Sequence, residues 1–86
     1  IPKVDLESGR NGRFFVGLEV ELGTYLVEAA PDTDRNVYRI TLFENEIIEH
    51  DAKATYFEMN GAEKTEISLK DGEVIEVVNC ILKRKP

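Results

Sequence analysis

The chain consists of short segments in which apolar and polar residues alternate, with glycine and other turn-forming residues between them. Tyr38, Ile40 and Leu42 occupy every second position of one such segment, so they share one face of a strand, which we expect to lie in the core. Twenty of the 86 residues are Val, Ile or Thr, whereas Ala and Met together supply six. This bias favours pleated sheet over helix. We therefore predict an all-β fold, a compact antiparallel sandwich or small barrel of seven to nine short strands.

The turn signals divide the chain into predicted strands at residues 13–16, 18–22, 24–30, 36–43, 46–49, 53–58, 64–70, 73–79 and 80–84. Asp71-Gly72 stands between two alternating runs and is typical of a two-residue type I′ turn. Residues 64–79 are therefore predicted to form a hairpin. Residues 51–59 fit either a strand or a short helical turn with Asp51 as its N-cap, because Ala52, Tyr56 and Met59 also have helical spacing.

The length of 86 residues indicates one domain. Residues 1–12 include the sequence Ser-Gly-Arg-Asn-Gly and are expected to form a loosely ordered N-terminal arm, followed by a single β domain at 13–86. So small a core leaves few apolar side chains for a deep pocket. A large active-site cavity is therefore not expected.

The charge balance is acidic, with 11 Lys and Arg against 17 Asp and Glu and a formal net charge of −6. This sign repels a phosphate backbone, so no nucleic-acid partner is expected. The basic cluster Lys83-Arg84-Lys85 is smaller than polybasic recognition segments usually are, which favours a solvated tail. With 42% hydrophobic and 33% charged residues, the composition is that of a globular domain, and no membrane insertion of this segment is expected.

Two segments carry ligand types suited to metals. His50, the single histidine, lies in the acidic segment 44–51 with Glu46 and Glu49, but alternation along a strand divides these groups between two faces. Residues 32–36 resemble the start of a calcium loop, yet Val37 and Phe43 stand where glycine and glutamate are needed. A solvated strand and a turn are therefore favoured, and no metal site or cofactor is predicted.

Catalytic groups are sparse. Cys80, the single cysteine, lies in an apolar stretch far along the chain from His50, and it is predicted to be a small buried core residue. With 17 carboxylates, closely spaced acid pairs arise by chance, and we expect them to keep exposed strands soluble. The pairs considered as glycosidase couples are Glu19 with Glu21 and Glu73 with Glu76. The protein is therefore predicted not to be an enzyme.

Phe14 and Phe15 are the candidate interaction residues. Adjacent residues of a strand point to opposite faces, so one of the two rings must face outward or lie beneath the N-terminal arm. The ring that faces outward is the best single candidate for an interaction surface in this sequence. We predict that this ring meets a protein partner or a second copy of the chain.

Two segments resemble a known family pattern. Residues 16–25, VGLEVELGTY, resemble the opening "V-G-x-D-I-P-A-G-x-Y" of small, largely uncharacterised all-β domains in surface or secreted proteins of Gram-positive bacteria. Residues 67–80, ISLKDGEVIEVVNC, resemble the hairpin "V-x-L-x-D-G-x-x-L-x-V" that closes those domains. Glu19, Val20 and the Glu21-Leu22 pair depart from the first pattern. The resemblance implies an extracellular or cell-surface location, without which a cytoplasmic one is expected, and it implies no catalytic residue.

These features predict a non-catalytic binding or assembly module. One alternative is a small metal-dependent binder or enzyme that uses His50 with Glu46 or Glu49. Another is a small barrel that binds oligonucleotides or carbohydrates through exposed rings near basic residues. Two combinations of an aromatic with a basic residue would serve such binding: Tyr38 with Arg39, and Tyr56 with Lys53.

Overall fold

The computed structural model describes residues 3–31, 37–44, 54–59 and 63–86. This part of the chain contains seven β-strands and one short 3-10 helix, which confirms the predicted all-β fold. The elements are η1 (Leu6–Ser8), β1 (Gly12–Phe15), β2 (Gly23–Ala29), β3 (Tyr38–Phe43), β4 (Ala54–Met59), β5 (Lys64–Leu69), β6 (Val74–Val78) and β7 (Cys80–Arg84). None of the helices in these ranges has the length and apolar character needed to cross a membrane.

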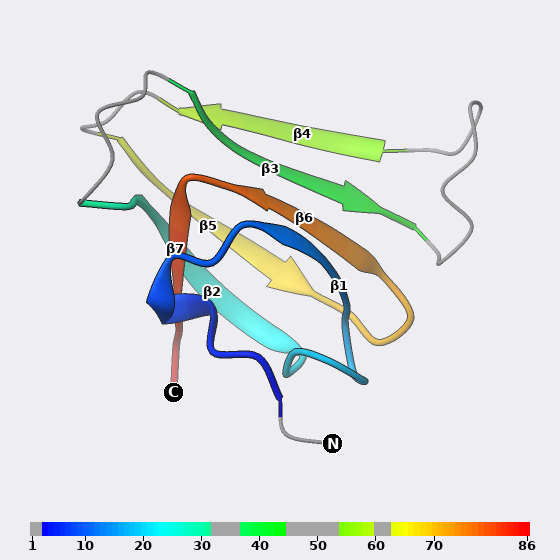
Figure 1. Ribbon diagram of the computed structural model, residues 1–86. Helices are drawn as coiled ribbons and strands as arrows, with labels where there is room; N and C mark the ends of the chain where they lie inside the picture. Colours follow the sequence, from blue (N-terminus) through cyan, green and yellow to red (C-terminus); the bar gives the residue numbers. More distant parts are fainter. Residues whose placement is uncertain (1–2, 32–36, 45–53, 60–62) are drawn as a thin grey trace.

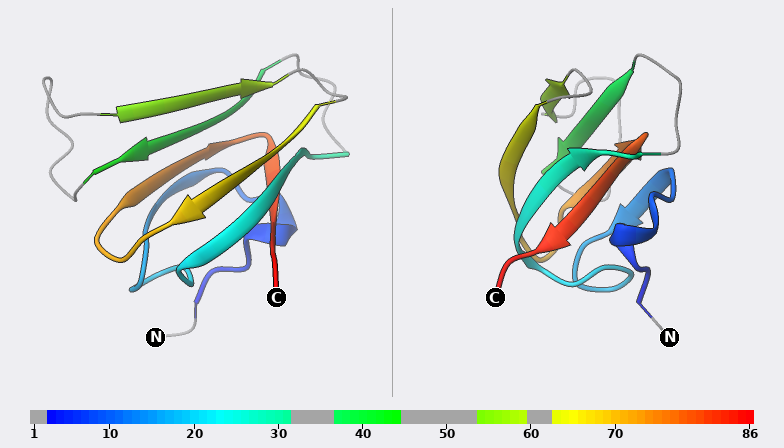
Figure 2. Two further views of the ribbon diagram at one scale, coloured as in Figure 1. Left: turned by 180° about the vertical axis from the view of Figure 1, so that it is seen from behind. Right: turned by 90° about the vertical axis from the view of Figure 1, so that its left-hand side faces the viewer.

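The strands form two antiparallel sheets. The four-stranded sheet has the order β1-β6-β3-β4 and the three-stranded sheet the order β5-β2-β7. In Figure 1 the four-stranded sheet lies toward the viewer, with β2 and β5 behind it, and Figure 2 shows the same layers from behind and from the side. Of the consecutive described strands, only β3 and β4 pair with each other. At most connections the chain therefore passes from one sheet to the other.

The core lies between the inner faces of the sheets. The four-stranded sheet contributes Phe14, Ile40, Ile75 and Val77, and the three-stranded sheet contributes Tyr25, Val27, Ile67, Leu69, Cys80 and Leu82. Ile40 is buried, and Tyr38 and Leu42 pack against the core partly buried, which confirms the face predicted for that segment. The hydroxyl group of the buried Tyr25 donates a hydrogen bond to the carbonyl of Glu21. This hydrogen bond satisfies the polar hydroxyl of a side chain whose ring otherwise packs against apolar residues of the core.

The outer face of the three-stranded sheet is polar. Glu28 Oε1 lies 3.7 Å from the ammonium groups of both Lys64 and Lys83, and Lys85 pairs with Glu66 at 2.7 Å. Such exposed pairs add little stability. Their alternation with buried residues is the pattern of a strand with one face in solvent.

Asn79 alone separates β6 from β7 and carries the chain between the sheets. Its φ of 55° lies in the left-handed region, and it is the only non-glycine residue with positive φ in the described ranges. Asparagine tolerates this conformation better than most residues. The Asn79 carbonyl accepts from the Ala30 N–H at 2.9 Å, and its side-chain amide donates to the Val37 carbonyl at 2.9 Å. The bend is therefore held by hydrogen bonds to the first and last residues of the connection between β2 and β3.

The predicted hairpin at 64–79 is wrong. β5 pairs with β2, whereas β6 pairs with β1 and β3 in the other sheet. The turn itself is present, because the Glu73 N–H donates to the Lys70 carbonyl at 3.2 Å. Only Gly72 has positive φ there, at 90°, whereas a type I′ turn needs positive φ at both central residues. The turn therefore joins two sheets rather than two paired strands.

Of the two forms predicted for residues 51–59, the strand is confirmed over residues 54–59, whereas the strand predicted at 18–22 is wrong. Residues 54–59 form strand β4, in which Phe57 lies opposite Ile40, because pairing satisfies the open edge of β3 in a way that a helical turn cannot. Residues 51–53 lie outside the described ranges. The strand predicted at 18–22 is a turn with an isolated bridge between Val16 and Val20. Gly17, with φ of 96°, reverses the chain there. The strand predicted at 46–49 also lies outside the described ranges.

Residues 3–11, the described part of the expected N-terminal arm, lie against the sandwich. Leu6 is buried in the core cluster, and η1 packs beside β7. The Val4 N–H donates to the Glu19 carbonyl at 2.6 Å. The segment thereby lies next to the turn that follows β1.

Candidate functional site

Phe14 and Phe15 point to opposite sides of the four-stranded sheet. Phe14 lies opposite Ile75 in the register of β1 and β6, and it is 4% exposed in the core. Phe15 lies opposite Val74 on the outer face and is 39% exposed. The structure thus assigns the exposed ring of the pair to Phe15, as the alternation along a strand requires.

The outer face of the four-stranded sheet carries a small apolar row next to this ring. Val74 on β6 lies between Phe15 on β1 and Phe43 on β3. Val74 and Phe43 are buried although neither belongs to the core cluster. The Arg13 guanidinium lies 5.7 Å from the Phe43 ring centre, a distance suited to a cation–π contact.

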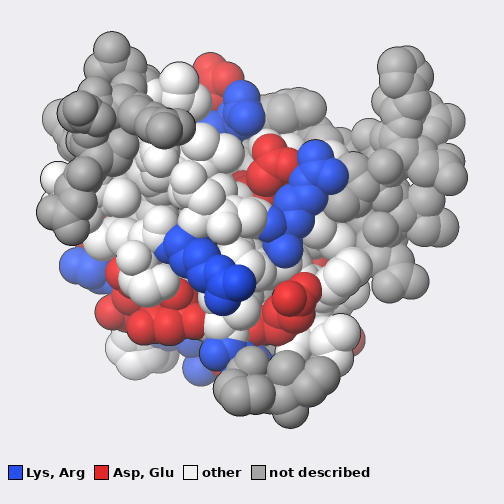
Figure 3. Space-filling model, viewed as in Figure 1, with Lys and Arg blue, Asp and Glu red and all other residues white. Residues whose placement is uncertain are grey.

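Charged side chains continue this outer face. Glu76 on β6 pairs with Arg13 on β1 and lies 3.8 Å from Arg39 on β3. Thr41, the cross-strand neighbour of Glu76, is 2% exposed, and its hydroxyl has no hydrogen-bond partner among the residues that the structure describes. Figure 3 shows basic and acidic side chains interspersed with uncharged surface on this side of the molecule. The face therefore presents both signs of charge.

A groove lies at the end of the sandwich where β1 stops. Its volume is about 570 Å³, and two turns from distant parts of the chain form its walls. The lining residues are Phe15, Val16, Gly17 and Leu18 on one side and Asp71, Gly72 and Glu73 on the other. Leu18 is 59% exposed, more than any other large hydrophobic residue in the described ranges. In Figure 1 the two turns lie side by side at the lower right.

Main-chain hydrogen bonds hold the two walls together. The Val16 N–H donates to the Glu73 carbonyl at 2.9 Å, and the Gly72 N–H donates to the Val16 carbonyl at 3.2 Å. A Cβ added at Gly17 would collide with Oδ1 of Asp71, so only glycine permits this close approach. These contacts bring the two segments that carry the family resemblance to one place.

Glu19 stabilises the wall that contains Phe15. Its carboxylate accepts from the Phe15 N–H at 3.0 Å, and its own N–H donates to the Phe15 carbonyl at 2.8 Å. Phe15 is therefore fixed by both of its main-chain polar groups. A ring on such a support loses little backbone entropy when it binds.

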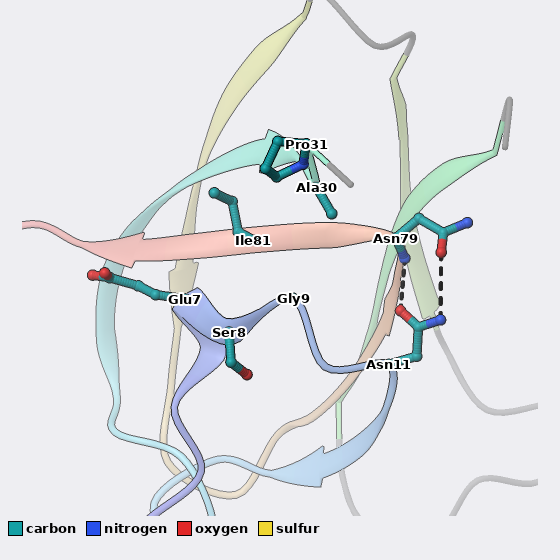
Figure 4. A pocket seen from close by; sticks show the side chains of 8 residues that line it. All are labelled: Glu7, Ser8, Gly9, Asn11, Ala30, Pro31, Asn79 and Ile81. Atoms are coloured by element: carbon teal, nitrogen blue, oxygen red, sulfur yellow. Dashed lines mark hydrogen bonds between the residues drawn. The ribbon is translucent and has the colours of Figure 1, made fainter. Parts of the chain in front are cut away.

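A second hollow of about 310 Å³ lies beside Asn79 (Figure 4). Figure 4 shows Asn11 and Asn79 facing each other, joined by two hydrogen bonds. The Asn11 amide donates to Oδ1 of Asn79 at 3.4 Å. Because these polar groups already satisfy one another, the hollow belongs to the bend between β6 and β7 rather than to a reactive site.

Cys80 is buried in the core, as predicted. Burial raises the pKa of its thiol to about 11, because a thiolate is poorly solvated among apolar side chains. The thiol lies 3.3 Å from the Val78 carbonyl. At neutral pH it is therefore protonated and shielded, and it is unsuited to act as a nucleophile.

Most of the other sequence candidates lie outside the described ranges, and the pair that the structure does describe, Tyr38 and Arg39, is divided between two faces. Tyr38 packs against the core, whereas Arg39, the next residue along the strand, pairs with Glu76 on the outer face. His50, Glu46, Glu49, Lys53 and residues 32–36 lie outside the described ranges, as does the Tyr56 side chain. Within the part of the chain that is described, no three His, Cys, Asp or Glu residues are grouped as metal ligands.

Sequence reasoning missed Leu18 and the approach of Asp71 to Gly17. The strand predicted at 18–22 gives no indication that Leu18 lies exposed in a turn. Gly17 is the one residue in this segment that signals a turn, but the alternation of apolar and polar residues at 18–22 equally fits a strand.

Comparison of the chain with protein-family models, curated proteins and solved structures finds no match.

Proposed function

We propose that this protein is a non-catalytic binding module that contacts a protein partner through the groove lined by Phe15 and Leu18. The observation that carries the proposal is the exposure of these two large apolar side chains on the wall of one groove. Apolar side chains gathered at one place on a small domain mark interaction surfaces more often than scattered ones do.

The support beneath the groove favours binding over chemistry. Val16, Gly72 and Glu73 hold its walls through main-chain hydrogen bonds, so the apolar side chains are presented on a preorganised frame. Burying them against a partner removes apolar area from water, worth about 25 cal/mol for each Å². The chain's only thiol lies in the core with a raised pKa and contributes no nucleophile to the groove.

Selection of displayed random peptides on the immobilised protein tests this proposal. The test variant is Phe15→Ser with Leu18→Ser. The matched control is Leu22→Ser with Val37→Ser, which removes two other exposed apolar side chains, 46% and 52% exposed. Circular dichroism and a thermal melt establish that both variants fold.

Selected peptides are expected to bind the wild type and the control alike and to bind the test variant roughly tenfold more weakly, a difference of about 1.4 kcal/mol. Enrichment of no peptide, or equal binding of the selected peptides to all three proteins, would overturn the proposal. Sedimentation equilibrium from micromolar to millimolar protein establishes in parallel whether the groove serves a second copy of the chain.

A further inference from the structure

We infer that the groove takes a segment in which an apolar side chain stands next to lysine or arginine, with the Asp71 carboxylate receiving the cation. This inference rests on the proposed function and names the chemistry of the partner. It is carried by the charge and the polar contacts of the residues that line the groove.

The groove combines an apolar wall with an acidic one. Phe15, Val16 and Leu18 supply the apolar surface, and the charged lining residues are Asp71 and Glu73, both acidic. Complementary charge at the edge of an apolar contact selects the partner and speeds the encounter. An apolar segment with an adjacent cation therefore matches both walls.

The two acidic groups differ in what they already bind. Glu73 Oε1 accepts from the Lys70 N–H at 2.6 Å, so this carboxylate is engaged within its own turn. The Asp71 carboxylate reaches across to Gly17 on the opposite wall. It forms no hydrogen bond or ion pair with the part of the chain that is described. Asp71 is therefore the group with capacity to accept a new cation.

The same end of the molecule already attracts one ammonium group. Lys3 Nζ donates to the carbonyl of Gly17 at 3.3 Å and lies 3.5 Å from the carbonyl of Leu18. The turn thus presents main-chain acceptors as well as carboxylates. Lys3 shows that a lysine side chain fits against this wall.

Charge argues against a second copy of the chain as the occupant. The protein has a net charge of −6, so two copies repel one another at long range. Its basic C-terminal residues are also engaged: Lys83 with Glu28, Lys85 with Glu66, and Arg84 Nε with the Leu22 carbonyl at 3.2 Å. A separate basic and apolar segment is the better match.

Three synthetic peptides of equal length test the inference: one of alternating leucine and lysine, one of leucine and serine, and one of leucine and glutamate. Binding is measured by NMR titration of the wild type and of three variants. Asp71→Ser removes the proposed anchor. Glu7→Gln removes one exposed negative charge away from the groove and is the matched control. Phe15→Ser with Leu18→Ser removes the apolar wall.

The leucine–lysine peptide is expected to bind most tightly and to shift the resonances of Leu18 and Gly72. Asp71→Ser should weaken it by roughly three- to fivefold, the effect of one exposed ion pair, and Glu7→Gln by less than about twofold. Added salt should reduce the effect of Asp71→Ser.

Two other results separate the inference from the proposed function. If all three peptides bind equally at the groove and all lose binding in the Phe15 and Leu18 variant, the inference is overturned and the proposed function stands. If no peptide depends on Phe15 and Leu18, both are overturned.

Discussion

The main-chain N–H of Asn79 donates to Oδ1 of Asn11 at 2.8 Å, across 68 positions of sequence. Asn11 immediately precedes β1, at one edge of the four-stranded sheet, and Asn79 is the bend between β6 and β7. The contact therefore joins the first strand to the point where the last two strands change sheets. A long-range bond of this kind stabilises the order of both sheets together.

Replacement of Asn79 is expected to destabilise the fold to an extent that depends on the new residue. Asn79→Ala loses the side-chain hydrogen bonds and retains a Cβ at positive φ, so we expect a loss of about 2–4 kcal/mol. Asn79→Gly loses the same bonds but relieves the backbone, and a loss of about 1–2 kcal/mol is expected. Urea unfolding measures both. Equal losses would show that the positive φ contributes nothing.

Substitution of Phe14 is expected to destabilise the fold more than the same substitution of the adjacent Phe15. Phe14→Leu alters a ring that is 4% exposed in the core, and we expect a loss of about 1–2 kcal/mol. Phe15→Leu alters a ring on the outer face and should change the free energy of unfolding by less than about 0.5 kcal/mol. Each variant is the control for the other in thermal unfolding. A larger effect at Phe15 would contradict the assignment of faces.

The sequence was informative where structure depends on alternation. The faces of Tyr38, Ile40 and Leu42, the opposite orientation of Phe14 and Phe15, and the burial of Cys80 all follow from local pattern and residue type. Each of these properties depends on which side of a strand a residue occupies. Alternation defines that side without knowledge of the neighbouring strand.

Strand partners were not predictable in the same way. Asp71-Gly72 correctly indicates a turn, but turn chemistry does not determine whether the flanking strands pair. Ile67 on β5 lies opposite Tyr25 on β2, more than forty residues away in sequence. The groove follows from such long-range pairing, because its two walls come from turns at 16–18 and 71–73. For that reason the sequence indicates that one of Phe14 and Phe15 is exposed, but it indicates neither that this ring is Phe15 nor that it shares a groove with Asp71.

Alanine at Gly17 is expected to cost more stability than alanine at Gly72. Both glycines have positive φ, 96° and 90°, so each substitution strains the backbone by about 1–2 kcal/mol. The added methyl group at Gly17 also meets the Asp71 carboxylate, whereas nothing lies within 4 Å of one at Gly72. Chemical unfolding of the two variants measures the difference.

The double variant Gly17→Ala with Asp71→Ser identifies the cause of that difference. If the carboxylate is responsible, the double variant should lose no more stability than Gly72→Ala, because the smaller side chain leaves room for the methyl group. A persistent excess loss would assign it to the backbone at Gly17 instead. A double-mutant cycle isolates this coupling.

Stability is expected to fall as the pH rises from about 9 to 11. The unfolded chain releases the Cys80 proton near the ordinary thiol pKa of 9.0, whereas burial raises the pKa in the folded chain to about 11. Between these values the folded state holds more protons, so the free energy of unfolding decreases with pH, by about 2 kcal/mol at pH 11. Below pH 9 the contribution is fully present.

Cys80→Ala separates this effect from the titration of other groups. Burial also raises the pKa of Tyr25, so its contribution has the same sign and begins near pH 10 in the unfolded chain. Tyr25 titrates in both proteins, and the difference between wild type and Cys80→Ala therefore reports the thiol alone. Guanidinium unfolding at pH 7, 9, 10 and 11 measures it. Parallel decreases in the two proteins would show that Cys80 does not titrate differently on folding and would contradict its burial.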